Sequence, residues 1–152
     1  MATYPPALPL PKLTGDRRKD FINVVHSQYG YKEIVEDYNA YSQEMRGYTP
    51  AIWCGDFIAW CLKKAGCSDL IPYGYENSQN WKNVGEKTNS PQKGDIVVFK
   101  WNKGQGSVGH AGMFEYIKDG RIFMIGGNQQ DTVNLSSYPM NDEFQGFYRP
   151  KF

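Results

Sequence analysis

The chain has 152 residues, the size of one ordinary domain, and it is long enough to bury a substantial core. Its 17 Lys and Arg nearly cancel its 16 Asp and Glu, so the net charge of +1 excludes a strong field that would attract nucleic acid or an anionic membrane. Aromatic residues make up 15% of the chain. They suit a groove that holds a polar polymer, and equally they fill cores. We expect a monomer with no nucleic-acid partner.

The three cysteines form neither a CxxC pair nor an even framework. Cys54 and Cys61 are seven positions apart, which on a helix is roughly 10 Å of rise and exceeds the ~7 Å between Cα atoms that a disulfide tolerates. All three are therefore expected as thiols. The two histidines and the spacing of the other ligand types do not fit a zinc site, so the sequence predicts no metal and no cofactor.

The first twenty residues contain four prolines and no long apolar stretch, which argues against a signal peptide or a membrane-spanning helix. We expect synthesis in the cytoplasm, so that a target outside the membrane would be reached through another export route or through lysis. Residues 1–15 are predicted to form an extended N-terminal arm, and residues 16–152 a single domain.

Three helices are predicted in the first half of the domain. A polar cap at Asp16 precedes an amphipathic pattern that stops at Gly30, a second pattern covers about 33–46, and a third covers 54–65 and ends at Gly66. Residues 67–94 are rich in turn-forming residues and are expected to be an irregular connection.

Strand patterns dominate the second half of the chain. They cover residues 96–101, 110–117, 121–125 and about 145–149. Helices followed by strands indicate an α+β domain with an antiparallel sheet.

Cys54 stands at the start of the third predicted helix, in the sequence Trp53-Cys54-Gly55-Asp56. Unpaired backbone N–H groups and the helix dipole favour an anion there, which lowers the pKa of a thiol and can stabilise an oxyanion. His110 opens a strand directly after a glycine-rich loop, where its ring can point into a cleft. Together the two residues meet the requirements for a nucleophile and its base.

The hairpin between residues 110 and 128 suggests a third member. If Lys118-Asp119-Gly120 forms a three-residue loop, counting back along the strands places Asn128 opposite His110. On that face Gly112 lies opposite Gly126. Because neither has a side chain, the helix that carries Cys54 can approach the sheet closely there. A two-residue Asp119-Gly120 loop would instead place Gln129 opposite His110. We favour the three-residue loop.

Four motifs in this order resemble a known family: Trp-Cys-x-Asp-Phe at a helix start, Gly-Asp-Ile-Val-Val-Phe at 94–99, Gly-His-Ala-Gly at 109–112 and Gly-Gly-Asn at 126–128. The sequence is similar to the cysteine, histidine-dependent amidohydrolase/peptidase (CHAP) domains, which are related to the NlpC/P60 and papain-like hydrolases. The resemblance covers about residues 20–150. It implies a papain-like α+β fold and a peptidoglycan hydrolase that cleaves an amide bond of the wall peptide.

When the roles of the family's motif residues are carried over to the matching positions, the resemblance implies Cys54 as nucleophile, His110 as base and Asn128 as the residue that orients the imidazole. Many relatives have Glu where this chain has Gly126, which leaves Asn128 as the strong candidate and Gln129 as the alternative. The family also implies a phage lysin or a type VI secretion amidase effector, and for a secreted toxin an immunity or inhibitor protein as partner.

Other residues have weaker claims. Asp56 is either a first-turn acid that satisfies the helix dipole or a contact for a substrate amine, and Trp53 and Gln129 are further candidate substrate contacts. His26 is expected to be structural, Cys61 a core thiol and Cys67 a loop thiol. Two rival functions use the same groove: a catalytically silent module that binds wall peptide or protein, and a thiol acyltransferase.

Overall fold

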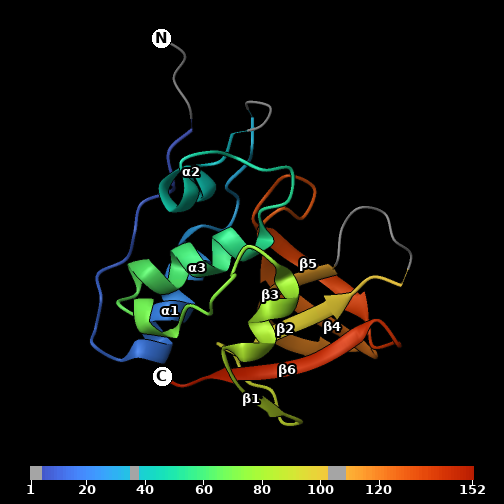
Figure 1. Ribbon diagram of the computed structural model, residues 1–152. Helices are drawn as coiled ribbons and strands as arrows, with labels where there is room; N and C mark the ends of the chain where they lie inside the picture. Colours follow the sequence, from blue (N-terminus) through green and yellow to red (C-terminus); the bar gives the residue numbers. More distant parts are fainter. Residues whose placement is uncertain (1–4, 35–37, 103–108) are drawn as a thin grey trace.

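Helices come first along the chain and strands follow, in a computed structural model that describes residues 5–34, 38–102 and 109–152 (Figure 1). The helices are α1 (Arg17–Ser27), α2 (Ala40–Arg46) and α3 (Cys54–Lys64), with the 3-10 turns η1 (Ser68–Leu70) and η2 (Ser78–Asn83). The strands are β1 (Gly85–Thr88), β2 (Ile96–Lys100), β3 (Gly109–Lys118), β4 (Arg121–Gly126), β5 (Asn134–Pro139) and β6 (Phe144–Pro150).

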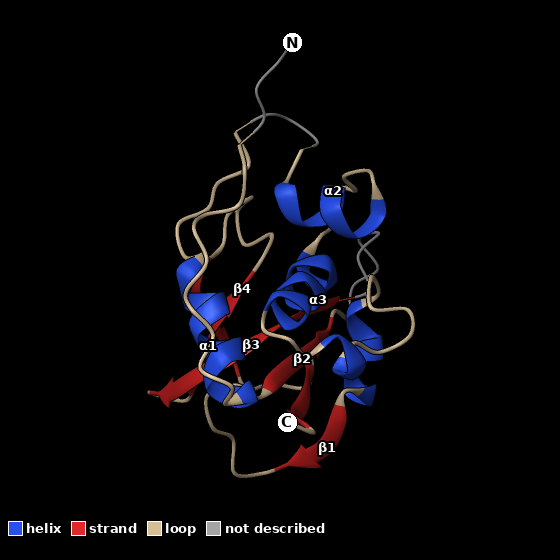
Figure 2. Cartoon of the chain, turned by 90° about the vertical axis from the view of Figure 1, so that its left-hand side faces the viewer, coloured by secondary structure: helices blue, strands red, loops and turns tan. Residues whose placement is uncertain are grey.

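The strands form one antiparallel sheet in the order β1-β6-β2-β3-β4-β5. Figure 2 shows α1 and α3 side by side against the strands. Alternate residues of β2 divide the apolar side chains into two layers, because successive side chains point to opposite faces. Ile96 and Val98 join the helix-side core, whereas Val97 and Phe99 join a smaller cluster on the other face. The predicted α+β class with an antiparallel sheet is confirmed.

The ends of α1 and α3 follow the predicted signals. The Asp16 side chain accepts the Lys19 amide at 3.1 Å, which caps α1, and Gly30 has a φ of 92° beyond its end. Gly66, with a φ of 79°, follows α3 in the same way. The prediction of helices in these two segments is confirmed, with α1 ending at Ser27.

The helix expected over about 33–46 is wrong in its first part, because α2 begins only at Ala40. Asn39 is extended, and its side chain accepts the Ser42 amide at 2.8 Å. Residues 30–33 are bonded instead to the segment 131–133, through backbone hydrogen bonds of 2.8–2.9 Å. The Glu33 backbone amide, at the start of the range expected to be helical, is thus satisfied by a non-local partner. Residues 35–37 lie outside the described part of the chain.

Two strands were missed by the sequence analysis. The segment 67–94, expected to be irregular, contains η1, η2 and the edge strand β1, which pairs with β6. The strand β5 pairs with β4 along its whole length at the opposite edge. Its sequence, Asn-Leu-Ser-Ser-Tyr-Pro, is only half-buried, so it lacks the apolar alternation by which strands are recognised.

The arm is ordered over residues 5–14 although it has neither helix nor strand there. The Leu8 amide donates to Gln28 Oε1, and Gln28 Nε2 donates back to the Leu8 carbonyl, both at 2.9 Å. Ala7 and Leu8 also pack against the helix-side core. This part of the arm therefore packs against the domain.

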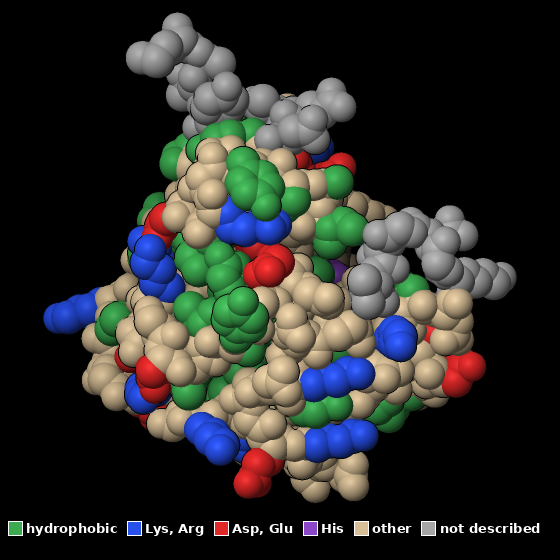
Figure 3. Space-filling model, viewed as in Figure 1, with side chains coloured by type: hydrophobic (Ala, Val, Ile, Leu, Met, Phe, Trp, Pro, Cys, Tyr) green, Lys and Arg blue, Asp and Glu red, His purple; other side chains and the backbone are tan. Residues whose placement is uncertain are grey.

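On the face seen in Figure 3, most hydrophobic side chains lie in the upper and central part, and several Lys and Arg side chains lie across the lower part. Among the described residues, no helix has the length and apolar character that crossing a membrane requires.

Asp95, directly before β2, links three distant segments. It is fully buried, and its carboxylate accepts hydrogen bonds from Arg149 Nη2 at 2.9 Å, from Arg149 Nε at 3.1 Å and from the backbone N–H of Gln92 at 2.8 Å. Arg18 Nη1 lies 3.4 Å from the same group. Helix α1, the start of β2 and the end of β6 are thus held by one carboxylate.

Replacing Asp95 with Ala should lower the free energy of unfolding by about 2–3 kcal/mol, because two guanidinium groups and an amide lose a charged acceptor. Chemical denaturation measures this loss. The matched control is Asp142→Ala, which removes an exposed carboxylate and should leave stability within about 0.5 kcal/mol of wild type. Equal stability of the two variants would contradict the linking role of Asp95.

Candidate active site

Cys54 is the first residue of α3, and its sulfur faces backbone amides. The first helical hydrogen bond runs from the Phe57 amide to the Trp53 carbonyl at 3.0 Å, so the amides before Phe57 precede the helical ladder. Trp53 holds the N-cap position, and an indole cannot accept a hydrogen bond from them. The amides of Gly55 and Ala111 make hydrogen-bond contacts with the Cys54 sulfur. Because Ala111 follows His110 on β3, Cys54 lies beside the strand that carries the candidate base.

Two glycines allow this close approach. A Cβ atom on Gly127 would lie 2.7 Å from Phe57 Cβ and 2.7 Å from Trp53 Cζ3. A Cβ atom on Gly55 would lie only 2.0 Å from the Tyr75 carbonyl oxygen. Side chains at these positions would push the start of α3 away from its neighbours.

The helix was expected to approach over Gly112 and Gly126, and this expectation is wrong. The space above Gly112 is taken by Met124 Cε, which a Cβ atom would meet at 2.4 Å. The space above Gly126 is taken by Gln129 Oε1 and His110 Nε2, at 3.0 and 3.3 Å from such an atom. Gly126 therefore leaves room for the side chains of Gln129 and His110. The start of α3 packs on Gly127 instead.

The hairpin also differs from the favoured prediction. Lys118 pairs with Arg121, so the loop is the two-residue Asp119-Gly120, with φ values of 52° and 72°. Positive φ at both positions is the type I′ turn, whose twist suits the flanking strands. A bulge at Glu115 then shifts the register, so that Phe114 pairs with Met124.

Asn128 does not reach His110, and Gln129 does. The chain leaves strand geometry after Gly126, and Asn128 takes a left-handed φ of 62°. Its side chain turns outward and donates to the Ala51 carbonyl at 3.3 Å. Gln129 Oε1 lies 2.9 Å from His110 Nε2. The prediction that Asn128 faces His110 is wrong, because strand counting does not extend through a left-handed residue.

Gln129 is itself held by residues of β5. Its Nε2 atom donates to the Asn134 carbonyl at 2.7 Å and to Asn134 Oδ1 at 2.8 Å. The Tyr138 hydroxyl donates to Gln129 Oε1 at 3.1 Å, and the Tyr138 ring lies 5.6 Å from the His110 ring. Asn134 and Tyr138 were missed with their strand. The polar alternation Asn134, Ser136, Tyr138 is the signal that marks them on one face.

Burial favours the neutral form of both members of the candidate pair. Burial lowers the pKa of His110, an effect that the Gln129 hydrogen bond opposes. Burial raises the pKa of the Cys54 thiol to about 11, although the amides of Ala111 and Gly55 act in the other direction. The expectation of a lowered thiol pKa at the helix start is therefore wrong for the unliganded protein, because desolvation outweighs the helix-end amides.

Trp53 and Asp56, which were candidate substrate contacts, are both fully buried. Trp53 Nε1 donates to Glu33 Oε2 at 3.1 Å. Asp56 Oδ2 accepts the Ser42 hydroxyl at 2.5 Å and Arg46 Nε at 3.1 Å, which ties α3 to α2. Both side chains serve contacts within the protein and are not available to a substrate.

The remaining thiols and His26 have structural surroundings. Cys61 is buried in α3, and Cys67 lies in the connection between α3 and η1, where it is buried as well. His26 Nε2 lies 2.5 Å from Glu115 Oε1 at the bulge of β3. Across the described residues, no group of His, Cys, Asp and Glu is arranged to hold a metal ion.

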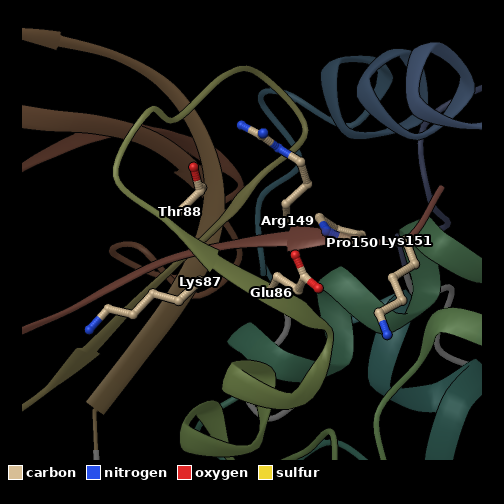
Figure 4. Close-up of a pocket in the computed structure, with 6 residues that line it drawn as sticks. All are labelled: Glu86, Lys87, Thr88, Arg149, Pro150 and Lys151. Atoms are coloured by element: carbon tan, nitrogen blue, oxygen red, sulfur yellow. The ribbon is translucent and has the colours of Figure 1, made fainter.

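A separate pocket of about 470 Å³ lies at the other end of the sheet, between β1 and β6 (Figure 4). Its lining is largely charged and comprises Glu86, Lys87, Thr88, Arg149, Pro150 and Lys151. In the sheet order, β6 and β2 separate β1 from β3. The pocket therefore shares no residue with the site around Cys54.

The Cys54 thiolate should form only in alkaline solution. Because the thiol pKa is about 11, its thiolate absorbance, measured as the difference between wild type and Cys54→Ala, should rise roughly tenfold per pH unit up to pH ~10. A titration step between about pH 4 and 8 would instead reveal a preformed thiolate and imidazolium pair, and would contradict the neutral pair.

Solved structures of other proteins share this fold. A protein similar to a lipoprotein of the NLP/P60 family from Staphylococcus aureus matches 92% of this chain with a TM-score of 0.54 and 16% identity. NlpC2 from Trichomonas vaginalis matches 90% of this chain with a TM-score of 0.54 and 15% identity. This chain covers 43% and 47% of those two chains, less than half of each. The papain-like, NlpC/P60-like fold is confirmed.

No curated protein matches the sequence. The model of the CHAP domain family matches residues 43–128, more than half of the chain, and this range contains Cys54 and His110 but ends one residue before Gln129. The chain belongs to the CHAP domain family.

Proposed function

We propose that this protein is a cysteine amidase or endopeptidase that hydrolyses an amide bond in the peptide of peptidoglycan. The CHAP family is a peptidoglycan-related family of amidases and peptidases, which supports the substrate class. One observation carries the chemistry: Cys54 contacts the amide of Ala111, directly beside His110, whose ring is bonded to Gln129. Cys54 is the nucleophile, His110 the base and Gln129 the residue that orients the imidazole.

The proton on His110 determines which nitrogen acts as the base. Gln129 presents its oxygen, which only accepts, so His110 Nε2 carries the hydrogen of the neutral ring. His110 Nδ1 then has the free lone pair and can accept the Cys54 proton. Because burial lowers the pKa of His110, the ring stays neutral and competent as a base below its ordinary pKa.

The reaction begins when the Cys54 sulfur attacks the carbonyl carbon while its proton passes to His110 Nδ1. Amides at the start of α3 stabilise the oxyanion that forms. The C–N bond then breaks, the amine leaves with the proton from the imidazolium, and a thioester remains on Cys54. Water, deprotonated by His110, attacks the thioester, and collapse of this second intermediate releases the carboxylic acid and restores the thiol.

Digestion of purified peptidoglycan tests the function. Wild-type protein should release fragments with new amine and carboxyl ends, and mass spectrometry of those ends identifies the bond. Cys54→Ala should release none while keeping the wild-type circular dichroism spectrum, because the nucleophile is lost and the cavity is small. Hydrolysis by Cys54→Ala at the wild-type rate would remove Cys54 from the mechanism.

Gln129→Ala should lower kcat about 10-fold or more, roughly 1.4 kcal/mol, and change KM less, because orientation of the base matters most in the transition state. The neighbouring variant Asn128→Gly is the matched control. Glycine accepts the left-handed φ of 62° at that position, so this variant should keep kcat within about twofold of wild type. A large loss in Asn128→Gly with little in Gln129→Ala would reverse the assignment.

A further inference from the structure

The side-chain amides of Gln129 and Asn134 form a reciprocal pair. Gln129 Nε2 donates to the Asn134 carbonyl at 2.7 Å, and Asn134 Nδ2 donates to the Gln129 carbonyl at 2.9 Å. A backbone carbonyl only accepts hydrogen bonds, so each contact identifies the facing atom as the amide nitrogen. The orientation of both amides is therefore fixed by their surroundings.

Further bonds hold Asn134 in this orientation. Its Nδ2 atom also donates to Thr132 Oγ1 at 2.6 Å, and its Oδ1 atom accepts the Ser136 hydroxyl at 2.7 Å as well as Gln129 Nε2 at 2.8 Å. Turning the Gln129 amide over would place its oxygen against two acceptors, Asn134 O and Oδ1. Two hydrogen bonds would be lost and two acceptors brought together, which is costly at the buried Gln129 side chain.

The turn between β4 and β5 is anchored to the helical half of the domain. Gln130 and Asp131 both have a φ of 60°, and the backbone N–H of Gln129 donates to the Thr132 carbonyl at 3.1 Å. The Val133 amide donates to the Tyr31 carbonyl, and the Gly30 amide to the Val133 carbonyl. This anchoring holds Gln129 and Asn134 at a fixed separation.

We infer that Asn134 is a positioning residue which, through Gln129, fixes the neutral His110 ring in the tautomer that carries its hydrogen on Nε2. Gln129 Oε1 faces His110 because Gln129 Nε2 is fully used by Asn134. With Oε1 accepting from both His110 and the Tyr138 hydroxyl, a lone pair on His110 Nε2 would find no donor there. The inference rests on the proposed function only in its consequence for catalysis, since the tautomer is a property of the unliganded protein.

The tautomer decides whether His110 can act as a base toward Cys54. If the Gln129 amide were free to turn, its nitrogen could donate to Nε2, and the hydrogen of the ring would move to Nδ1. That ring has no lone pair for the thiol proton. Asn134 thus favours the active tautomer without touching the substrate or the reacting atoms.

Nitrogen NMR of imidazole-labelled protein tests the tautomer directly. The chain has two histidines, and His26→Gln assigns the two sets of ring signals. At neutral pH, the wild-type His110 signals should show a protonated Nε2 and an unprotonated Nδ1. A wild-type His110 with its hydrogen on Nδ1 would overturn the inference.

Asn134→Ala is the main variant, because it removes both side-chain contacts with Gln129: the Oδ1 atom that accepts from Gln129 Nε2 and the Nδ2 atom that donates to the Gln129 carbonyl. Position 134 is half-buried, so truncation leaves little cavity. We expect a mixture of His110 tautomers, a kcat at least about fivefold lower and a KM within about twofold of wild type. Asn134→Asp keeps the Oδ1 acceptor and should shift the tautomer less. His110 tautomers and a kcat equal to wild type in folded Asn134→Ala would overturn the inference.

Ser137→Ala is the matched control on the same strand. The Ser137 hydroxyl accepts from Arg121 Nε at 2.9 Å on the exposed side, away from Gln129. This variant should keep both the tautomer and kcat, and a tautomer shift in it equal to that of Asn134→Ala would overturn the inference. The two proposals fail differently: wild-type protein that cleaves no peptidoglycan contradicts the proposed function, whereas the NMR signals report on Asn134 even then.

Discussion

The close approach of the start of α3 to the sheet is the constraint on which the rest of the site depends. Phe57 and Trp53 pack onto Gly127 at a distance that leaves no room for a side chain. The same approach brings the Cys54 sulfur to the Ala111 amide of β3. A helix held farther from the sheet would still bury its apolar face, but its first turn would no longer meet the strand that carries His110. The absence of a side chain at Gly127 therefore allows the contact between the start of α3 and the sheet that places Cys54 beside β3.

Dense burial at this junction determines the chemistry of the resting protein. Cys54 and His110 are 1% and 7% exposed, so the uncharged forms of both groups are favoured. A buried neutral histidine needs a defined hydrogen-bond partner, and Gln129 supplies a neutral one. An amide cannot stabilise an imidazolium as a carboxylate would, so in the proposed mechanism charge separates only when a substrate carbonyl is present. This arrangement fits a nucleophile that is deprotonated during attack rather than before it.

The sequence predicted much of this organisation because the signals were local. Helix α3 combines an apolar face with a glycine just beyond its end, and β2 to β4 have continuous or alternating apolar residues. The motifs around Cys54 and His110 were recognisable for the same reason. A helix was expected from about residue 33, yet the Glu33 backbone amide bonds to the Asp131 carbonyl, about a hundred positions away. Such pairing leaves no periodic trace in either segment.

The third residue shows where counting along a strand fails. The favoured register was wrong at the loop, but the bulge at Glu115 shifts it by one residue, so that Phe114 pairs with Met124 as the count expected. Strand geometry ends at Gly126, and the left-handed Asn128 turns its own side chain out and brings Gln129 in. Neither the bulge nor the left-handed residue has a sequence signal strong enough to place it. The supporting residues on β5 were missed because polar side chains fill an edge strand.

Trapping the covalent intermediate tests directly whether Cys54 is the nucleophile. Protein mixed with peptidoglycan fragments and quenched in acid within one turnover can be digested and mapped by mass spectrometry. The proposed mechanism predicts an acyl group in thioester linkage on the peptide that contains Cys54, and none when His110 is replaced by Ala. An acyl group on Cys61, on Cys67 or on a residue other than cysteine would contradict it.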